Sequence, residues 1–262
     1  MLSAGIDIGS RTIALVVLDG MEIVKSDLAD TGFTPLEKAR EIIYSLPFKT
    51  SIIATGYGRH AAKAEFAHST HSIITEIKAH ALGVTHLFPE ARTVLDIGGQ
   101  DMKVISLDDQ GNVDDFLMND KCAAGTGKFI EVMANALGYS TVGDFGRDSL
   151  SGSPGSKISS MCTVFAESEA ISLLHKGAAR QDIGRALHVS VVERAFSLLQ
   201  RVGFKTPIVF TGGVAVNPCI TEMLKEKLKV PVTVPKDPQL IARSGRRLPD
   251  LKKPLAIKLN EA

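Results

Sequence analysis

Short apolar runs separated by turn signals dominate the first part of the chain. Ala4–Ile8, Ile13–Leu18 and Glu22–Ser26 are predicted as three closely spaced strands, because each run is short and bounded by turn residues. Gly9-Ser10 marks the first turn, and Asp19-Gly20 is typical of a tight hairpin. The pattern then predicts, in chain order, a helix, a strand and a second helix at Pro35–Ser45, Ser51–Thr55 and Thr75–Leu87.

The same order of elements begins again after Pro89. Strands are predicted at Thr93–Ile97, Met102–Leu107 and Asn112–Leu117, and a helix at Gly127–Leu137. Ser149–Ser156 has the composition of a surface loop. Further helices and strands are expected at Thr163–His175, Asp182–Val202, Ile208–Thr211, Pro218–Leu228 and Val230–Val234.

Each half therefore opens with three strands joined by turns and continues into a helix. This repeat of architecture predicts an α/β fold class with two lobes and a cleft between them. The first lobe is assigned to residues 1–90 and the second to residues 91–239.

Composition narrows the class of protein. The 262 residues are 44% hydrophobic and 23% charged, with a formal net charge of +1, which fits a globular chain. A balanced charge predicts neither nucleic acid nor a membrane surface as a partner. No apolar run approaches the ~20 residues of a transmembrane helix, and no signal peptide is recognised, so the expected localisation is cytoplasmic.

Three glycine-containing turns carry the first functional signal. Asp7-Ile8-Gly9-Ser10-Arg11-Thr12 and Asp96-Ile97-Gly98-Gly99-Gln100-Asp101 occupy equivalent places in the two halves, and Thr211-Gly212-Gly213 follows a later strand and leads to Asn217. Glycine lets backbone N–H groups approach phosphate oxygens, and a carboxylate at a strand end can hold Mg²⁺. Together the three turns predict a nucleotide bound between the lobes.

Other nucleotide and catalytic motifs do not fit. Gly125-Thr126-Gly127-Lys128 resembles the end of a P-loop, but Cys122 stands where the first glycine belongs and Phe129 where Ser or Thr belongs. The first strand is not followed by G-x-G-x-x-G, and the histidines and serines form neither a zinc-hydrolase pair nor a nucleophile elbow.

The three cysteines are too few for a paired disulfide framework. Cys122 precedes the glycine-rich turn that enters the predicted helix at Gly127, and Cys162 directly precedes the predicted helix at Thr163. A helix N-terminus favours a thiolate, yet a free cysteine is more often a small buried residue. Two cysteines give half of the four thiolates of a [4Fe–4S] cluster, so a cluster would need a symmetric dimer.

The order of the motifs resembles the actin, chaperone ATPase and sugar kinase superfamily, with two ribonuclease H-like lobes. Within it, residues 4–240 resemble the activators of 2-hydroxyacyl-CoA dehydratases, close relatives of the benzoyl-CoA reductase ATPase subunits. The resemblance rests on the strings Thr55-Gly56-Tyr57-Gly58-Arg59, Asp96-Ile97-Gly98-Gly99-Gln100-Asp101, Asn119-Asp120-Lys121-Cys122-Ala123-Ala124-Gly125-Thr126-Gly127 and Ser160-Met161-Cys162-Thr163-Val164-Phe165-Ala166-Glu167-Ser168-Glu169.

The resemblance implies an ATPase that carries one electron to a partner acyl-CoA dehydratase or reductase. Its implied cofactors are ATP or ADP, Mg²⁺ and one [4Fe–4S] cluster, which Cys122 and Cys162 of each subunit of a homodimer would ligate; Cys219 is expected to be structural. Ferredoxin or flavodoxin is the expected electron donor. Asp7, Gln100 and Asp101 are the predicted catalytic residues, and the predicted nucleotide contacts are Gly9, Ser10, Arg11, Thr12, Asp96, Gly98, Gly99, Gly125, Gly127, Gly212, Gly213 and Asn217.

Three alternatives stay open at this point: a benzoyl-CoA reductase-type ATPase subunit, a small-molecule kinase without a cluster, and a regulatory ATPase that uses closure only to bind a partner. One departure from the family follows Pro238-Gln239, where a helix rich in small residues is usual. The resemblance predicts that residues 240–262 pack back on the first lobe, but Arg243, Arg246 and Arg247 disfavour close helix packing there.

Overall fold

The computed structural model describes residues 2–19, 22–46, 50–66, 70–119, 122–155, 158, 162–239 and 241. The segment predicted to return to the first lobe, residues 240–262, lies outside the described residues except for Ile241. The same holds for Arg243, Arg246 and Arg247, so the expected disturbance of packing by these arginines stays a prediction.

The first sheet has the strand order β3-β2-β1-β4-β5. β1 pairs antiparallel with β2, β2 pairs antiparallel with β3, and β4 lies parallel to both β1 and β5. β2 is apolar and buried from Ile13 to Leu18, as suits a strand with neighbours on both sides, whereas β1 at the centre of the sheet also contains Ser3, Gly5 and Asp7. The bounds are β1 Leu2–Ile8, β2 Thr12–Asp19, β3 Glu22–Asp30, α1 Pro35–Tyr44, β4 Ser51–Thr55, α2 Arg59–Glu65 and β5 Thr70–Ile73.

The second sheet repeats this topology with the strand order β10-β9-β6-β7-β8. β6 and β7 pair antiparallel as β1 and β2 do, and β9 lies parallel to β6 as β4 lies parallel to β1. The remaining bounds are β6 Thr93–Ile97, β7 Met102–Leu107, β8 Val113–Asn119, α4 Gly127–Ala136, α5 Val142–Leu150, α6 Thr163–His175, α7 Arg180–Val202, β9 Ile208–Thr211, the 3-10 helix η1 Gly213–Val216, α8 Pro218–Leu228 and β10 Val232–Thr233.

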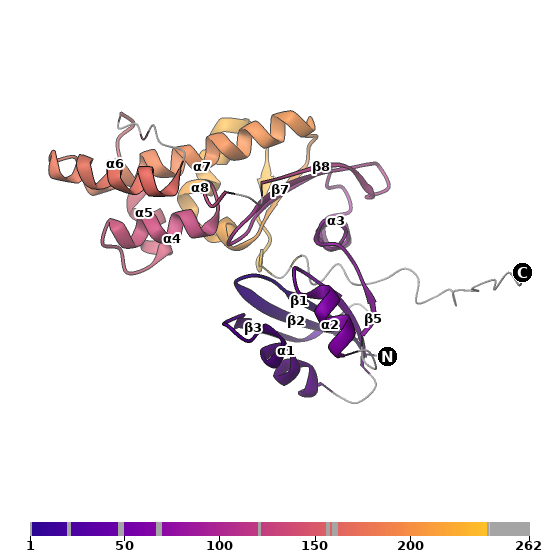
Figure 1. The fold of residues 1–262 in the computed structure, drawn as a ribbon. Coiled ribbons are helices and arrows are strands. Elements are labelled where there is room, and N and C mark those ends of the chain that lie inside the picture. The colour runs from indigo at the N-terminus through magenta and orange to yellow at the C-terminus, as the bar shows by residue number, and fades with distance from the viewer. Residues whose placement is uncertain are drawn as a thin grey trace, which may run out of the picture.

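Two sheets of equivalent topology confirm the predicted two-lobed α/β fold. Figure 1 shows the first sheet with α1 and α2 on one side of the molecule and the helices α4 to α8 gathered beyond the second sheet. Each sheet has its own apolar core: the cluster of the second half includes Phe129, Phe145 and Phe210, and that of the first half includes Ile6 and Leu15.

α3, at Glu76–Leu87, connects the two halves. Its buried Ala81 and Val84 belong to a third cluster with Ile105 and Ile241, so this helix packs on the second sheet. Figure 1 shows α3 beside the hairpin of β7 and β8. The lobe boundary between residues 90 and 91 stays a prediction, and the packing of α3 would favour an earlier one.

Most elements lie where the sequence predicts them, and the differences have local causes. α2, β5 and α5 are additional elements: α2 and β5 are short, and α5 contains Gly143 and Gly146, which disfavour a helix. Ser149 and Leu150, predicted to begin a loop, complete α5. α7 begins at Arg180, two residues before the predicted Asp182.

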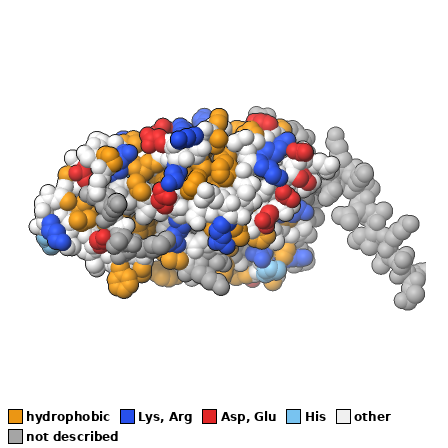
Figure 2. Space-filling view, turned by 90° about the horizontal axis from the view of Figure 1, so that it is seen from above, with side chains coloured by type: hydrophobic (Ala, Val, Ile, Leu, Met, Phe, Trp, Pro, Cys, Tyr) orange, Lys and Arg blue, Asp and Glu red, His pale blue; other side chains and the backbone are white. Residues whose placement is uncertain are grey.

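The described helices include none with the length and apolar character to span a bilayer. Lys and Arg side chains alternate with Asp and Glu on the face shown in Figure 2, with apolar side chains between them. This mixed face matches the balanced charge of the sequence.

Candidate functional site

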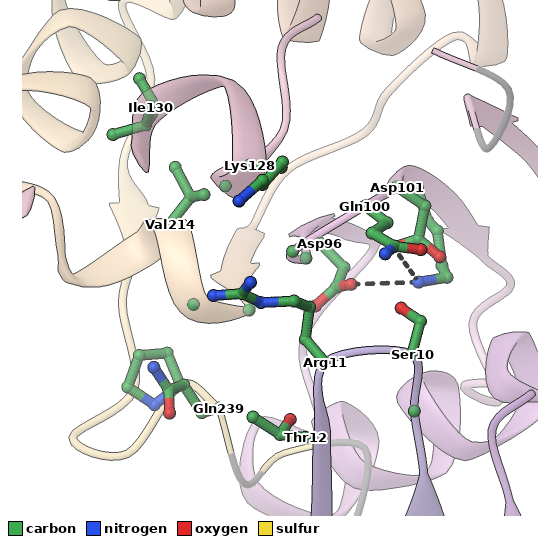
Figure 3. Close-up of a pocket in the computed structure, with 18 of the residues that line it drawn as sticks. Ser10, Arg11, Thr12, Asp96, Gln100, Asp101, Lys128, Ile130, Val214 and Gln239 are labelled. Carbon is green, nitrogen blue, oxygen red and sulfur yellow. Dashed lines mark hydrogen bonds and ion pairs between the residues drawn. The ribbon is translucent and has the colours of Figure 1, made fainter. Parts of the chain in front are cut away.

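A cleft of about 500 Å³ lies between the two halves. Figure 3 shows Ser10, Arg11 and Thr12 entering it from the first half and Asp96, Gln100 and Asp101 from the second. The structure brings nearly all the predicted nucleotide and catalytic residues to this cleft: Asp7, Gly9, Ser10, Arg11, Thr12, Asp96, Gly98, Gly99, Gln100, Asp101, Gly127, Gly212, Gly213 and Asn217.

The first two glycine turns have the same backbone construction. The Gly9 N–H donates to the carbonyl of Thr12 at 3.0 Å, and the Gly98 N–H donates to the carbonyl of Asp101 at 2.9 Å. Each bond closes a tight turn between two antiparallel strands, β1 to β2 and β6 to β7. The turns thus present Ser10-Arg11 and Gly99-Gln100 to the same space.

A second pair of glycines supports these turns from behind. Gly56 follows β4 with φ +86°, and a Cβ there would lie 2.5 Å from the carbonyl oxygen of Ile8. Gly212 follows β9 with φ +90°, and a Cβ there would lie 2.3 Å from the carbonyl oxygen of Ile97. Both positions require glycine because of the conformation and the close approach. Gly56 of the Thr55–Arg59 motif therefore packs against the first glycine turn as Gly212 packs against the second.

A buried lysine joins the carboxylates at the base of the cleft. Lys103 Nζ lies 2.7 Å from Asp101 Oδ1, 3.4 Å from Asp96 Oδ2 and 3.9 Å from Glu76 Oε2, and the residue is 2% exposed. Thr211 donates its hydroxyl to Asp96 at 2.8 Å, and His80 Nδ1 lies 3.5 Å from the same carboxylate. Residues from three elements, β7, β9 and α3, thus fix the Asp96 side chain.

These contacts shift the ionisation of the cluster. Burial alone would raise the pKa of Asp96, but His80, Lys103 and the Thr211 hydrogen bond together lower it. Burial alone would lower the pKa of Lys103, but the neighbouring carboxylates, led by Asp96, raise it. Burial raises the pKa of Glu76 to about 7, and burial lowers the pKa of His80. Asp96 and Lys103 are therefore charged at neutral pH.

Sequence reasoning missed several residues that line the cleft. Glu76 and His80 reach it because α3 lies on the second sheet, which the local pattern does not reveal. Lys103 does carry a usable signal, because it is the one charged residue inside the mostly apolar run Met102–Leu107. Lys128, Glu131, Val216 and Gln239 also line the cleft.

Asn217 and Gly125 occupy different settings from the other predicted contacts. Asn217 Oδ1 accepts the N–H groups of Cys219 and Ile220 and so caps α8, while its Nδ2 lies 3.0 Å from His188 Nε2. Gly125 is not among the lining residues of the described chain, and a Cβ there would lie 2.6 Å from Cδ of Arg194. The Asn217 amide therefore stabilises the start of α8, directly after the Gly212–Val216 segment. Gly125 lies against Arg194 of α7.

The cysteines divide into two exposed residues and one buried residue. Cys122 is exposed shortly before α4, and Cys162 is exposed at the N-cap of α6. The two helices pack against each other. Cys219 is buried on α8, and burial raises the pKa of its thiol to about 11. The thiols at the two helix starts are thus accessible for ligation, while Cys219 is not.

Most of the chain matches a known protein family. The model of the BadF/BadG/BcrA/BcrD ATPase family matches residues 4–246. The chain belongs to this family. As a member of this family it is an ATPase, and its motifs resemble those of the dehydratase activators and benzoyl-CoA reductase subunits, as predicted.

Three relatives place the chain within the family. It is 41% identical to the activator of lactoyl-CoA dehydratase of Anaerotignum propionicum, over 95% of this chain and 96% of the relative. A solved structure of the 2-hydroxyisocaproyl-CoA dehydratase activator of Clostridium difficile with bound ADPNP has 40% identity and a TM-score of 0.85, and the match covers 94% of this chain and 92% of that one. Identity to a benzoyl-CoA reductase subunit from Thauera aromatica is 30%, covering 87% of this chain and 83% of the relative.

Proposed function

We propose that this ATPase is an activator of a 2-hydroxyacyl-CoA dehydratase and delivers one electron to it at the expense of ATP. The observation that carries the proposal is the combination of the interlobe cleft with two exposed cysteines at the starts of packed helices. The higher identity to a dehydratase activator than to the benzoyl-CoA reductase subunit favours the dehydratase as partner.

The nucleotide is proposed to bind in the cleft with its phosphates against the glycine turns. Backbone N–H groups of Ser10, Gly99 and Gly213 are the candidate donors, because these turns face the cavity from both halves. The Gly9 N–H instead holds its turn closed by donating to the Thr12 carbonyl. Apolar Val214 and Val216 line the cleft close to Gly212-Gly213, where an adenine would fit. Asn217 also lines the cleft, with its amide bonded to α8 and His188, and Gly125 supports this arrangement from outside the lining.

Asp7, Asp96 and Asp101 are the proposed carboxylates for Mg²⁺. The described residues contain no group of three or more His, Cys, Asp or Glu arranged to hold a metal. This fits a magnesium ion that takes most ligands from phosphate and water. Lys103 already neutralises Asp96 and Asp101, so a metal there would bind together with the nucleotide. Gln100, exposed at the tip of the second turn, is the proposed residue for orienting the attacking water.

Cys122 and Cys162 of each of two subunits are the proposed ligands of one [4Fe–4S] cluster. When bound, the cluster supplies the one-electron chemistry, with ferredoxin or flavodoxin as donor. Both thiols fit this role because they are exposed: Cys162 is the N-cap of α6, where the helix dipole favours the negative charge of a cluster, and Cys122 lies in the segment that leads into α4. The resulting homodimer and a cytoplasmic localisation belong to the same proposal.

Anaerobic purification tests the proposal. We expect brown protein that absorbs near ~400 nm and contains about four Fe per dimer. Cys122→Ala and Cys162→Ala should each lose the iron yet bind ADPNP as the unmodified chain does, while the matched change Cys219→Ala should keep both properties. Colourless, iron-free protein that still hydrolyses ATP would support a kinase or regulatory ATPase instead. Iron retained by Cys122→Ala would refute the ligand assignment.

A further inference from the structure

An ion pair between Arg11 and Glu131 joins the two halves across the cleft. Arg11 belongs to the first phosphate turn and Glu131 to α4 of the second half. Arg11 Nη2 lies 3.2 Å from Glu131 Oε1 and 3.1 Å from Oε2. Both residues line the cleft that we assign to the nucleotide.

Glu131 also forms an ion pair with a second positive side chain, Lys128. Lys128 Nζ lies 3.3 Å from Glu131 Oε2, so one carboxylate faces two positive side chains. Figure 3 shows Arg11 extending through the cleft toward the side of Lys128 and Val214. The stem of Arg11 crosses Gly99, where a Cβ would lie only 2.9 Å from Arg11 Cγ. Gly99 thus leaves the space through which Arg11 reaches α4.

We propose that Glu131 is a positioning residue that holds Arg11 and Lys128 in the nucleotide-free cleft, and that nucleotide phosphates replace it as their anion. This inference rests on the proposed nucleotide site. The side chains of Arg11 and Glu131 are 49% and 33% exposed, and half-exposed ion pairs are weak. A polyphosphate carries more charge than one carboxylate and accepts more hydrogen bonds from guanidinium. Arg11 and Lys128 therefore bind the phosphates in preference to Glu131.

The start of α4, the helix that carries Glu131, is also bonded to the second glycine turn. The Gly127 and Lys128 N–H groups donate to the carbonyls of Gly98 and Gly99, each at 2.8 Å, which ties α4 to the second phosphate turn. Cys122 lies five residues before Gly127 on the same segment. Release of Glu131 from Arg11 would therefore remove this link between the first half and α4, the helix that follows the Cys122 segment, when nucleotide binds.

Titration of the full-length chain with ADPNP by calorimetry tests the exchange. Glu131→Gln removes the competing charge and keeps the size of the side chain, so we expect ADPNP to bind about two- to fivefold more tightly. Arg11→Met should weaken binding. In the double variant the gain from Glu131→Gln should be clearly smaller than in the unmodified background, because the cation it releases is gone.

Glu193→Gln is the matched control. Glu193 pairs with Lys227 at 2.7 Å, has an exposed side chain and is not among the residues lining the cleft. Its substitution should leave ADPNP affinity unchanged. Unchanged or weaker affinity in Glu131→Gln would overturn the inference, and so would an equal gain with and without Arg11, which would indicate general charge repulsion. Failure of the unmodified chain to bind ADPNP would instead refute the proposed nucleotide site.

Discussion

Buried charge at single positions organises the cleft. Lys103 lies in the middle of a sheet, where an unpaired ammonium would be strongly disfavoured, and three carboxylates compensate it. This arrangement keeps Asp96 charged and fixes the Asp101 side chain beside Lys103. The acidic residues of the site are therefore positioned by the protein itself before nucleotide arrives.

His188 supports the opposite side of the site as a neutral group. Its Nδ1 is 2.7 Å from the carbonyl oxygen of Gly184, so Nδ1 carries the proton and Nε2 accepts from Asn217 Nδ2. Complete burial lowers the pKa of His188 to about 4. Asn217 is thereby held as the cap of α8 directly after the Gly212–Val216 segment.

His188 should make the stability of the protein depend on pH. Below pH 6.5 the unfolded chain binds a proton that the native ring takes up only near pH 4, so native stability falls as the pH drops from 6.5 through 4. Urea unfolding at several pH values should show that the stability advantage of the unmodified chain over His188→Gln shrinks by roughly 2–3 kcal/mol across this window. A constant difference between the two proteins would contradict a buried neutral His188.

The limits of sequence reasoning are clearest at these residues. Asp7, Asp96 and Gly212 could be predicted because strand, acid and glycine follow one another along the chain. Glu76 and His80 could not, because their place depends on α3 crossing to the second sheet. Gly125 belongs to a glycine-rich string, yet its space is taken by Arg194 from α7, a contact that no local pattern encodes.

At the scale of elements, the two halves use one construction twice. In each half, a parallel strand beside the central one ends in a glycine that closely approaches the central strand's last residues: Gly56 at Ile8 and Gly212 at Ile97. The strands could be predicted because their apolar runs are continuous. α5 could not, because its two glycines disfavour a helix. Tertiary packing requires one of them to be small, since a Cβ on Gly146 would lie 2.6 Å from Asn217 Oδ1.

The glycine after β9 should be far more sensitive than a glycine that only ends a helix. Gly212 has φ +90° and ψ 173°, a region that is essentially restricted to glycine, and a Cβ would clash with the Ile97 carbonyl. Gly203 has φ +72° with nothing within 4 Å of a Cβ. We expect Gly212→Ala to destabilise the fold by about 2–4 kcal/mol and to weaken ADPNP binding, against about 1 kcal/mol for Gly203→Ala. Thermal unfolding and ADPNP titration measure both, and equal effects at the two positions would show that the close approach is unimportant.

At the scale of the whole molecule, the two proposed activities lie at different places. The nucleotide cleft lies between the halves, whereas Cys122 and Cys162 precede helices of the second half and are outside the lining of the cleft. α4 connects the two places, because the N–H groups of its first turn donate to carbonyls of the second glycine turn, at Gly98 and Gly99. Opening or closing of the cleft around nucleotide would therefore move the cysteine segments as part of one lobe.

Removal of the proposed cluster should change the size of the particle. Each chain offers two exposed thiols, so four thiolates require two chains, and the cluster itself becomes the main link between them. Val164 and Phe165, 65% and 66% exposed beside Cys162, would add apolar contacts around the cluster. Light scattering of anaerobic protein should give twice the 28.0 kDa of the chain, and chelation of the iron should reduce the mass to 28.0 kDa. Cys162→Ala should be a monomer from the start, while Cys219→Ala should remain a dimer. A dimer that persists in the iron-free protein would show that protein surfaces alone hold the two chains together.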